Sequence, residues 1–247
     1  MDKLIYVAMT GARETLRSQS AVSHNLSNIN TPGFRSVQHS MQSAPIDGAG
    51  LPTRVNSVMA AAAWNDRAGS MLQTGRALDV AVQGEGWLTV QGPDGEEAFT
   101  RAGNLRVSPT GLLETPAGQL VLGNSGPISI PQFQRIDIAN DGRISIVPVG
   151  SKPNGVAEVD QLKLVNPPRD ELQRGENGLF RRRDGEAGIA DPAVRIASGQ
   201  LEASNVNAAQ SLVEMIELSR RFEMQVRSMN QAEQMDEAAT RLMRMSG

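Results

Sequence analysis

Residues 206–245 read VNAAQSLVEMIELSRRFEMQVRSMNQAEQMDEAATRLMRM, a stretch of forty residues that contains neither glycine nor proline. Its apolar residues recur every three or four positions, which is the spacing of one face of an α-helix. At about 1.5 Å per residue, such a helix would be roughly 60 Å long. Because a helix gains most of its stability by packing its apolar face, this sequence requires a partner.

The other end of the chain carries a similar pattern. Residues 3–28 place apolar side chains mostly three or four positions apart, and Pro32-Gly33 follows as a stop signal. We therefore expect a helix there, and it is the nearest available partner for the C-terminal helix. The two ends are predicted to pair as a coiled-coil-like helical domain.

The middle of the chain has a different character. All 13 prolines lie between Pro32 and Pro192, and 22 of the 24 glycines lie between Gly33 and Gly199. Turn sequences recur from residue 75 onward, and Asn140-Asp141-Gly142 between alternating isoleucines is typical of a β-hairpin. Residues 34–74 show no period and predict an extended arm, with a short helical turn near 60–64.

The expected fold class is therefore α+β, with an antiparallel β domain inserted between two terminal helices. We expect four segments: residues 1–33 as the N-terminal helix of a discontinuous helical domain, 34–74 as the extended arm, 75–200 as the β domain, and 201–247 as the C-terminal helix. One uniform α/β domain would not confine glycine and proline in this way.

Composition excludes several kinds of function. The net charge is −3, which offers no basic field for nucleic acid or an anionic membrane. The chain has no cysteine and only two histidines, His24 and His39, without metal-ligand spacing. No apolar run approaches the roughly 18 residues of a membrane-spanning helix. We therefore expect no catalytic residue, no cofactor, no metal and no membrane insertion.

Two competing classes are weaker. A hydrolase of the cell wall would need a paired acid and base, and no spacing nominates such a pair. A trimeric β-fibre with a coiled-coil stalk would show cleaner heptads and usually a signal peptide. An interaction protein remains, because a head-to-tail contact between copies that does not close builds an open helical assembly. The expected helical interface comprises Ile5, Met9, Ala12, Leu16, Val22, Leu26, Leu212, Ile216, Phe222, Val226, Met229, Met235 and Leu242.

Three sequence blocks resemble one known family. Asn25–Arg35 reads NLSNINTPGFR, Leu78–Trp87 reads LDVAVQGEGW followed by FTRAGN at Phe99–Asn104, and Gly199–Val206 reads GQLEASNV. In this order they resemble the signatures of bacterial flagellar rod and hook proteins. Ser27 replaces the usual alanine, and Trp87-Leu88 replaces a common aromatic pair. The motif residues are Asn25, Leu26, Asn28, Thr31, Gly33, Phe34, Leu78, Asp79, Gly84, Gly86, Thr100, Arg101, Gly103, Gly199, Leu201, Glu202, Ser204 and Asn205.

The resemblance implies a structural, non-enzymatic subunit of the flagellar axis. It implies that the chain assembles with copies of itself and other rod subunits into the shaft that transmits torque from motor to hook. It also implies export by the flagellar type III apparatus without a cleaved signal, and a place in the periplasmic rod of the basal body. The start of the chain and its length most resemble proximal-rod subunits, with distal-rod or hook-related subunits as the alternative.

Overall fold

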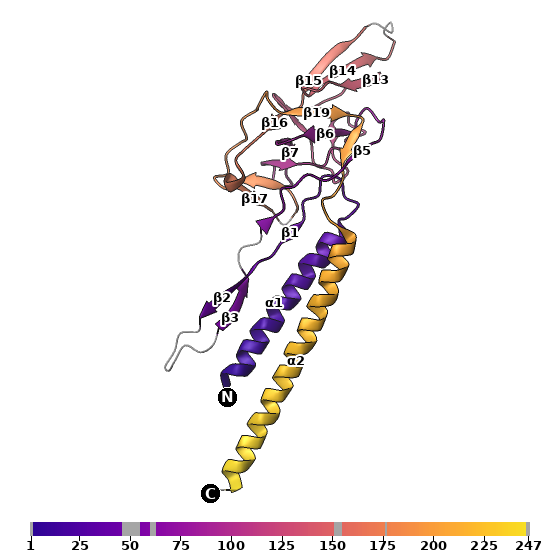
Figure 1. Ribbon diagram of the computed structural model, residues 1–247. Coiled ribbons are helices and arrows are strands. Elements are labelled where there is room, and N and C mark those ends of the chain that lie inside the picture. Colours follow the sequence, from indigo (N-terminus) through magenta and orange to yellow (C-terminus); the bar gives the residue numbers. More distant parts are fainter. Residues whose placement is uncertain (1, 46–54, 60–62, 151–154, 176, 246–247) are drawn as a thin grey trace. The chain divides into compact units, whose positions relative to one another are not determined.

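The computed structural model describes residues 2–45, 55–59, 63–150, 155–175 and 177–245 (Figure 1). The chain divides into two compact units, and the predicted α+β fold class is confirmed. Unit 1 comprises Met1–Ile29, Ser36–Asn65 and Val206–Gly247, and unit 2 comprises Asn30–Arg35 and Asp66–Asn205.

Two long helices dominate unit 1. Helix α1 spans Asp2–Ser27 and α2 spans Ala208–Met245, close to the predicted ranges. Figure 1 shows them side by side and running in opposite directions, with α2 extending beyond the N-terminal end of α1. Thr15 Oγ1 donates to Gln225 Oε1 at 3.2 Å across their contact. The predicted pairing of the two ends is confirmed, and neither described helix is both long and apolar enough to cross a membrane.

The predicted arm contributes short strands. In unit 1, β1 (Val37–Gln38) pairs antiparallel with β4 (Ala63–Trp64), and β2 (Met41–Pro45) pairs antiparallel with β3 (Val55–Met59). The expected helical turn near 60–64 is wrong at Ala63–Trp64, where the backbone is a strand, and residues 60–62 lie outside the described ranges. The arm is extended because its backbone pairs with itself, without the helical hydrogen bonds that the run of small residues suggested.

Unit 2 consists of antiparallel β-structure. Its first strands are β5 (Met71–Gln73), β6 (Val80–Gln83), β7 (Trp87–Gln91), β8 (Glu97–Thr100), β9 (Arg106–Val107), β10 (Leu113–Glu114), β11 (Leu122–Gly123) and β12 (Gly126–Pro127). There follow β13 (Phe133–Ile138), β14 (Arg143–Pro148), β15 (Ala157–Gln161), β16 (Leu164–Val165), the 3-10 helix η1 (Arg169–Glu171), β17 (Leu172–Arg174), β18 (Phe180–Arg182), β19 (Arg195–Ser198) and β20 (Gln200–Glu202).

The described strands of unit 2 form one larger sheet and several small ones. The five-stranded sheet has the order β16-β7-β8-β18-β17, and β13-β14-β15 form a three-stranded sheet. Strand β6 pairs with β19, β5 with β20, β9 with β10, and β11 with β12. The pairing of β5 with β20 joins residues from the two ends of unit 2, so the chain closes this unit before it returns to the helices.

The predicted hairpin around Asn140-Asp141-Gly142 is confirmed. Ile136 lies opposite Ile146 on strands β13 and β14. Gly142 adopts a φ of +87°, which the turn requires and glycine supplies without strain. The isoleucines join an aliphatic core of residues that share very low exposure: Val80, Val82, Leu88, Val90, Leu105, Leu113, Val121, Ile128, Ile144, Ile146, Leu164 and Ile196.

We predict that Ile144→Ala destabilises unit 2 by about 2–5 kcal/mol, because it removes a fully buried side chain and leaves a cavity. The measurement is urea unfolding of the full chain in a Trp64→Phe background, where Trp87, buried in unit 2, becomes the single tryptophan. The control is Val156→Ala at an exposed position. Equal midpoints for the two variants would contradict the prediction.

Candidate functional site

A buried carboxylate lies at the centre of the site. Glu202, at the end of β20, is 1% exposed and accepts contacts from two arginines. Arg35 Nη2 lies 2.8 Å from Glu202 Oε1, and Arg101 Nη1 lies 3.1 Å from Glu202 Oε2. We call Arg35, Arg101 and Glu202 the junction triad. Each member comes from a different sequence block, so the triad joins segments that are far apart along the chain.

Backbone groups complete the surroundings of the triad. The Gly69 amide donates to Glu202 Oε1 at 3.0 Å, and Arg101 Nη2 donates to the carbonyl of Gly84 at 2.7 Å. The guanidinium of Arg101 also lies 5.2 Å from the ring centre of Trp87, a cation–π geometry. These contacts hold the three charged side chains in one arrangement.

The triad holds two positive groups against one negative group. Burial lowers the pKa of both Arg35 and Arg101 from the ordinary arginine value, and the charge of Glu202 opposes that shift. The Nε atoms of both arginines are buried without a hydrogen-bond partner among the described residues. An arginine keeps its proton even so. Glu202 therefore neutralises charges that would otherwise be buried at a cost of several kcal/mol.

The first and third sequence blocks run beside each other at the triad. The amide of Gly33 donates to the carbonyl of Glu202 at 2.7 Å, and the amide of Asn205 donates to the carbonyl of Phe34 at 3.2 Å. The ring of Phe34 lies 4.9 Å from the guanidinium carbon of Arg174. Backbone and side-chain contacts therefore fasten residues 33–35 to residues 202–205 within unit 2.

Gly33 satisfies two constraints at once. Its φ of +68° is unfavourable for other residues, as the position after a helix end suggests. A side-chain carbon added there would also lie 2.1 Å from the carbonyl carbon of Arg101. Backbone conformation and close packing therefore both require glycine beside the triad.

Hydrogen bonds of the second sequence block hold backbone segments of unit 2 together. Thr74 Oγ1 donates to Asp79 Oδ2 at 2.7 Å, and the amide of Gly199 donates to the carbonyl of Asp79 at 2.7 Å. The carbonyl of Gly103 accepts from the amide of Val80 at 2.9 Å. The motif residues of this block therefore hold backbone segments together.

The remaining motif residues have local roles. Asn25 grips the backbone of Val37, since its side chain donates to the carbonyl and accepts from the amide, both at 2.8 Å. Asn28 Nδ2 donates to the carbonyl of His24 at 2.9 Å near the end of α1. Leu26 lies in α1, and the others lie in strands or connecting segments: Thr31, Leu78, Gly84, Gly86, Thr100, Leu201 and Ser204.

The predicted helical interface residues do not share one face in unit 1. Ala12 and Val22 are buried, and Ile5, Leu26, Phe222, Val226 and Met229 are half-buried. In contrast, the side chains of five predicted residues are exposed: Met9, Leu16, Leu212, Ile216 and Met235. The side chain of Leu242 lies outside the described residues.

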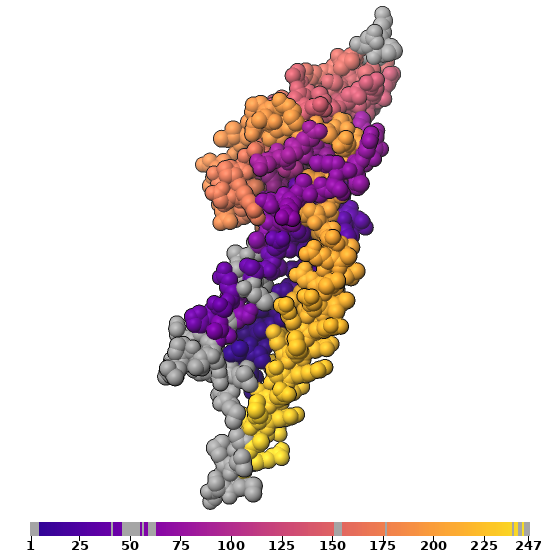
Figure 2. Space-filling model, in the orientation of Figure 1, coloured from indigo at the N-terminus to yellow at the C-terminus, as the bar shows by residue number. Residues whose placement is uncertain are grey.

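Helix α2 therefore has two apolar faces. Its buried residue Leu218 packs on the α1 side. At 3.6 residues per turn, Leu212 lies roughly 120° and Ile216 roughly 160° around the helix from Leu218. The two side chains are 49% and 56% exposed. Figure 2 shows the orange-to-yellow surface of α2 uncovered along much of its length. This second face, Leu212, Val213 and Ile216, has no covering element among the described residues.

Sequence reasoning missed which residues bury the helix contact. On α1 the buried set includes the polar residues Glu14, Thr15 and Ser18, and on α2 it includes Ser211. Small and polar residues carry no apolar periodicity, so the pattern followed the larger residues instead. Thr15 and Gln225 meet across the helix contact, but they are far apart in the sequence, so no local pattern pairs them.

The described residues contain no group of three or more acidic or histidine side chains that could hold a metal ion. Gly84-Glu85-Gly86 connects β6 and β7. The arginines of β18 also face acids, since Arg181 Nη2 donates to Asp94 Oδ1 at 2.7 Å. The site therefore has two features: the junction triad, which holds distant segments together, and the uncovered second face of α2. Both features suit a protein that assembles.

Comparison with known proteins points the same way. Three family models match: "Flagella basal body rod protein" at residues 5–35, "Flagellar hook protein FlgE/F/G D1 domain" at 81–146, and "Flagellar basal body rod FlgEFG protein C-terminal" at 197–242. The chain is 42% identical to the flagellar basal-body rod proteins FlgF of Salmonella typhimurium and of Escherichia coli K12, over 100% of both chains in each case. It is 28% identical to FlgG of Buchnera aphidicola from Schizaphis graminum, over 94% of this chain and 96% of that protein.

We predict that Glu202→Gln destabilises unit 2 by about 3–5 kcal/mol, because two buried guanidinium groups lose their counter-charge. The control is Asp137→Asn, which removes an acid from the exposed pair with Arg135 and should change stability by at most about 1 kcal/mol. Urea unfolding followed by Trp87 fluorescence measures both. A Glu202 variant as stable as its control would refute a charge-neutralising role.

We also predict that Gly33→Ala destabilises the chain by about 1–3 kcal/mol more than Gly75→Ala does, because only Gly33 has backbone atoms where the new carbon would lie. The two glycines have matching φ values, +68° and +72°, and Gly75 has open space around it. The difference between the variants in thermal unfolding isolates the packing cost from the cost of a positive φ.

Proposed function

Since the chain belongs to the flagellar basal-body rod protein family, we propose that it assembles with copies of itself and with other rod subunits into the proximal part of the flagellar rod. It is a structural subunit of the rod. Its identity to the two FlgF proteins, 42%, against 28% to the FlgG protein, favours an FlgF-like over an FlgG-like position.

The observation that carries this proposal is the second apolar face of α2. Leu212, Val213 and Ile216 face away from α1, and three large aliphatic side chains next to one another are costly to leave in water. A helix from a neighbouring subunit would bury them. In such an assembly each α2 lies between its own α1 and a helix of another subunit, which supports a continuous helical layer.

The junction triad supports a mechanical role. Segments 30–35 and 203–205 lie next to unit 1 in sequence, and contacts to Glu202 and its neighbours fix both in unit 2. Torque that travels along the chain between the units must pass through such segments. A buried ion pair with backbone contacts on both sides resists their separation, which suits a shaft that transmits rotation from motor to hook.

Further parts of the proposal follow from family membership. The role is non-enzymatic, the location is the periplasmic rod, and the flagellar type III apparatus exports the chain without a cleaved signal. The absence of cysteine suits a chain threaded in an unfolded state, since no disulfide can form early. We also propose that residues 1–33 and 201–247 act as the helical domain, 34–74 as the arm and 75–200 as the β domain, and that the apolar helix residues named above form the contacts between subunits.

We predict that Leu212→Ser with Ile216→Ser strongly reduces incorporation into basal bodies and motility while the helix pair stays intact, because both side chains point away from α1. The measurements are the amount of the chain in purified basal bodies, swimming in soft agar, and circular dichroism of the free subunit. The matched control is Glu214→Ser with Glu217→Ser, which alters exposed polar positions on the same turns. Normal incorporation of the Leu212 and Ile216 variant would count against the proposal.

A further inference from the structure

An apolar side chain projects from the surface of unit 2. Ile189 is 81% exposed, the largest exposed fraction of any large hydrophobic residue that the structure describes. Single exposed apolar residues are common in proteins and by themselves need no explanation. The way in which the chain holds Ile189 in place is what distinguishes it.

Hydrogen bonds and close packing fasten both sides of Ile189. The amide of Gly188 donates to Glu97 Oε1 at 2.8 Å, and the other oxygen of Glu97 lies 2.7 Å from Lys163 Nζ. Gly188 is buried against Phe99, where an added carbon would lie 3.0 Å from the ring. On the other side, the amide of Asp191 donates to the carbonyl of Leu164 at 2.8 Å. The loop is thus pressed onto the sheet at Gly188, and the next side chain points outward in a fixed position.

Unit 2 also contains an apolar groove. Its volume is about 390 Å³, and hydrogen bonds preform its walls, since the amide of Ile130 donates to the carbonyl of Gly111 at 2.7 Å. Ser108 accepts from Gly111 in the turn that forms one wall, at 2.9 Å. The apolar lining residues are Val107, Pro109, Ile130, Pro131, Phe133 and Val149.

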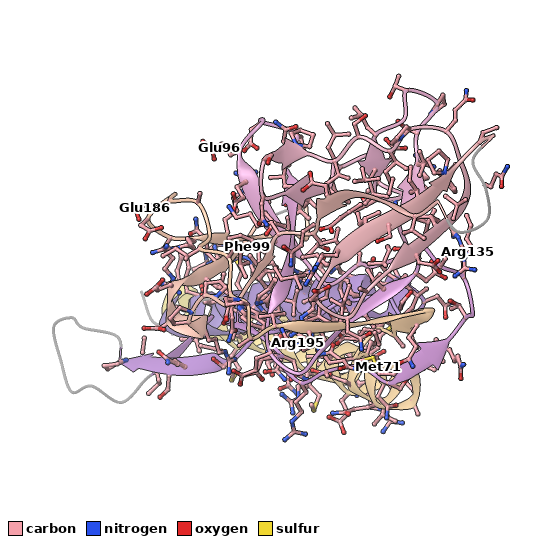
Figure 3. All side chains as sticks on the ribbon, turned by 90° about the horizontal axis from the view of Figure 1, so that it is seen from above. Met71, Glu96, Phe99, Arg135, Glu186 and Arg195 are labelled. Atoms are coloured by element: carbon pink, nitrogen blue, oxygen red, sulfur yellow. The ribbon has the colours of Figure 1, made fainter. Side chains whose placement is uncertain are left out.

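Sequence neighbours of the projecting residue and of the groove lie on opposite sides of unit 2. Figure 3 labels Glu186, three residues before Ile189, and Arg135, two residues after Phe133 of the groove, on opposite sides of the unit. Their charges are complementary. Glu186 is exposed and forms no ion pair with a described residue, while Arg135 contacts Asp137 through Nε and is itself largely exposed.

We propose that Ile189 of one copy of this chain inserts into the groove of the next copy, with Glu186 beside Arg135 of that neighbour. A contact between opposite flanks of identical molecules is head-to-tail, so it repeats from copy to copy and builds a ring or an open helix. The inference rests on the proposed function, in which copies are neighbours in the rod. It adds a contact between the β units to the contact between the helices.

The test uses the absence of cysteine in the natural chain. Ile189→Cys and Gln132→Cys, the latter on the groove wall, are introduced together into the full chain in flagellated cells. Purified basal bodies are treated with a mild oxidant and separated without reductant. A disulfide forms only when the two β-carbons approach within about 3.5–4.5 Å. The control pairs Ile189→Cys with Ala117→Cys, which is exposed in a turn outside the groove.

The expected result is a ladder of dimers and higher multimers of this chain for the Ile189 and Gln132 variant alone. Either single variant should give none, because a head-to-tail contact never brings the same residue together with itself. Glu186→Arg in the double-cysteine background should weaken the ladder, and adding Arg135→Glu should restore it.

The remaining outcomes overturn the inference in different ways. Full incorporation without a ladder, or an equal ladder in the Ala117 control, excludes the Ile189 contact and leaves the proposed function standing. A disulfide with a different axial protein, introduced as a cysteine-bearing relative, shows that the groove partner is not a second copy. A natural chain missing from basal bodies overturns the proposed function and the inference together.

Discussion

The arrangement of unit 2 depends on one buried carboxylate between two arginines. Arg35 and Arg101 both contact Glu202, and without this carboxylate two buried guanidinium groups would lack a counter-charge, which costs several kcal/mol. The three side chains come from segments separated by more than sixty residues at each step. None of these segments can therefore move away alone, and the glycine at position 33 lets the backbone come close enough for the contact to form.

The sequence predicts the elements whose causes are local. The helix at 206–245 follows from a long run without breakers, and the hairpin at Asn140–Gly142 follows from turn residues between alternating isoleucines. No local sequence pattern predicts the triad, because the identity of a charged residue does not indicate whether its side chain will be buried. Only the family resemblance points to Arg101 and Glu202, and Arg35 stands in its sequence block without a role that the sequence indicates. Their common function depends on long-range pairing of β5 with β20, which no periodicity reveals.

The burial of residues around α2 shows why the spacing of apolar residues alone does not predict which face of α2 contacts α1. The buried positions on the described part of α2 are Ser211, Leu218 and Ala232, whereas the predicted interface names Leu212 and Ile216, which are exposed. The larger residues thus remain outside the intramolecular contact. Among the described residues of α2, Leu218 is the one large apolar side chain that is buried, so apolar burial within the pair uses only part of the helix's apolar residues. In the proposed assembly, another subunit would cover the exposed large apolar residues, and this would link assembly to helix stability.

Contacts in both units would make the rod stiff in a way that either contact alone would not. If neighbouring copies meet through the second face of α2 and through Ile189 in the groove, each unit is fixed to its counterparts independently. A twist applied to one set of contacts then reaches the other only along the chain, through segments such as 30–35 and 203–205. Those are the segments that the junction triad and its backbone bonds fasten within unit 2. If torque passes along these segments in the assembled rod, the buried contacts of Glu202 would resist their separation more than an exposed ion pair, worth at most about 1 kcal/mol, would.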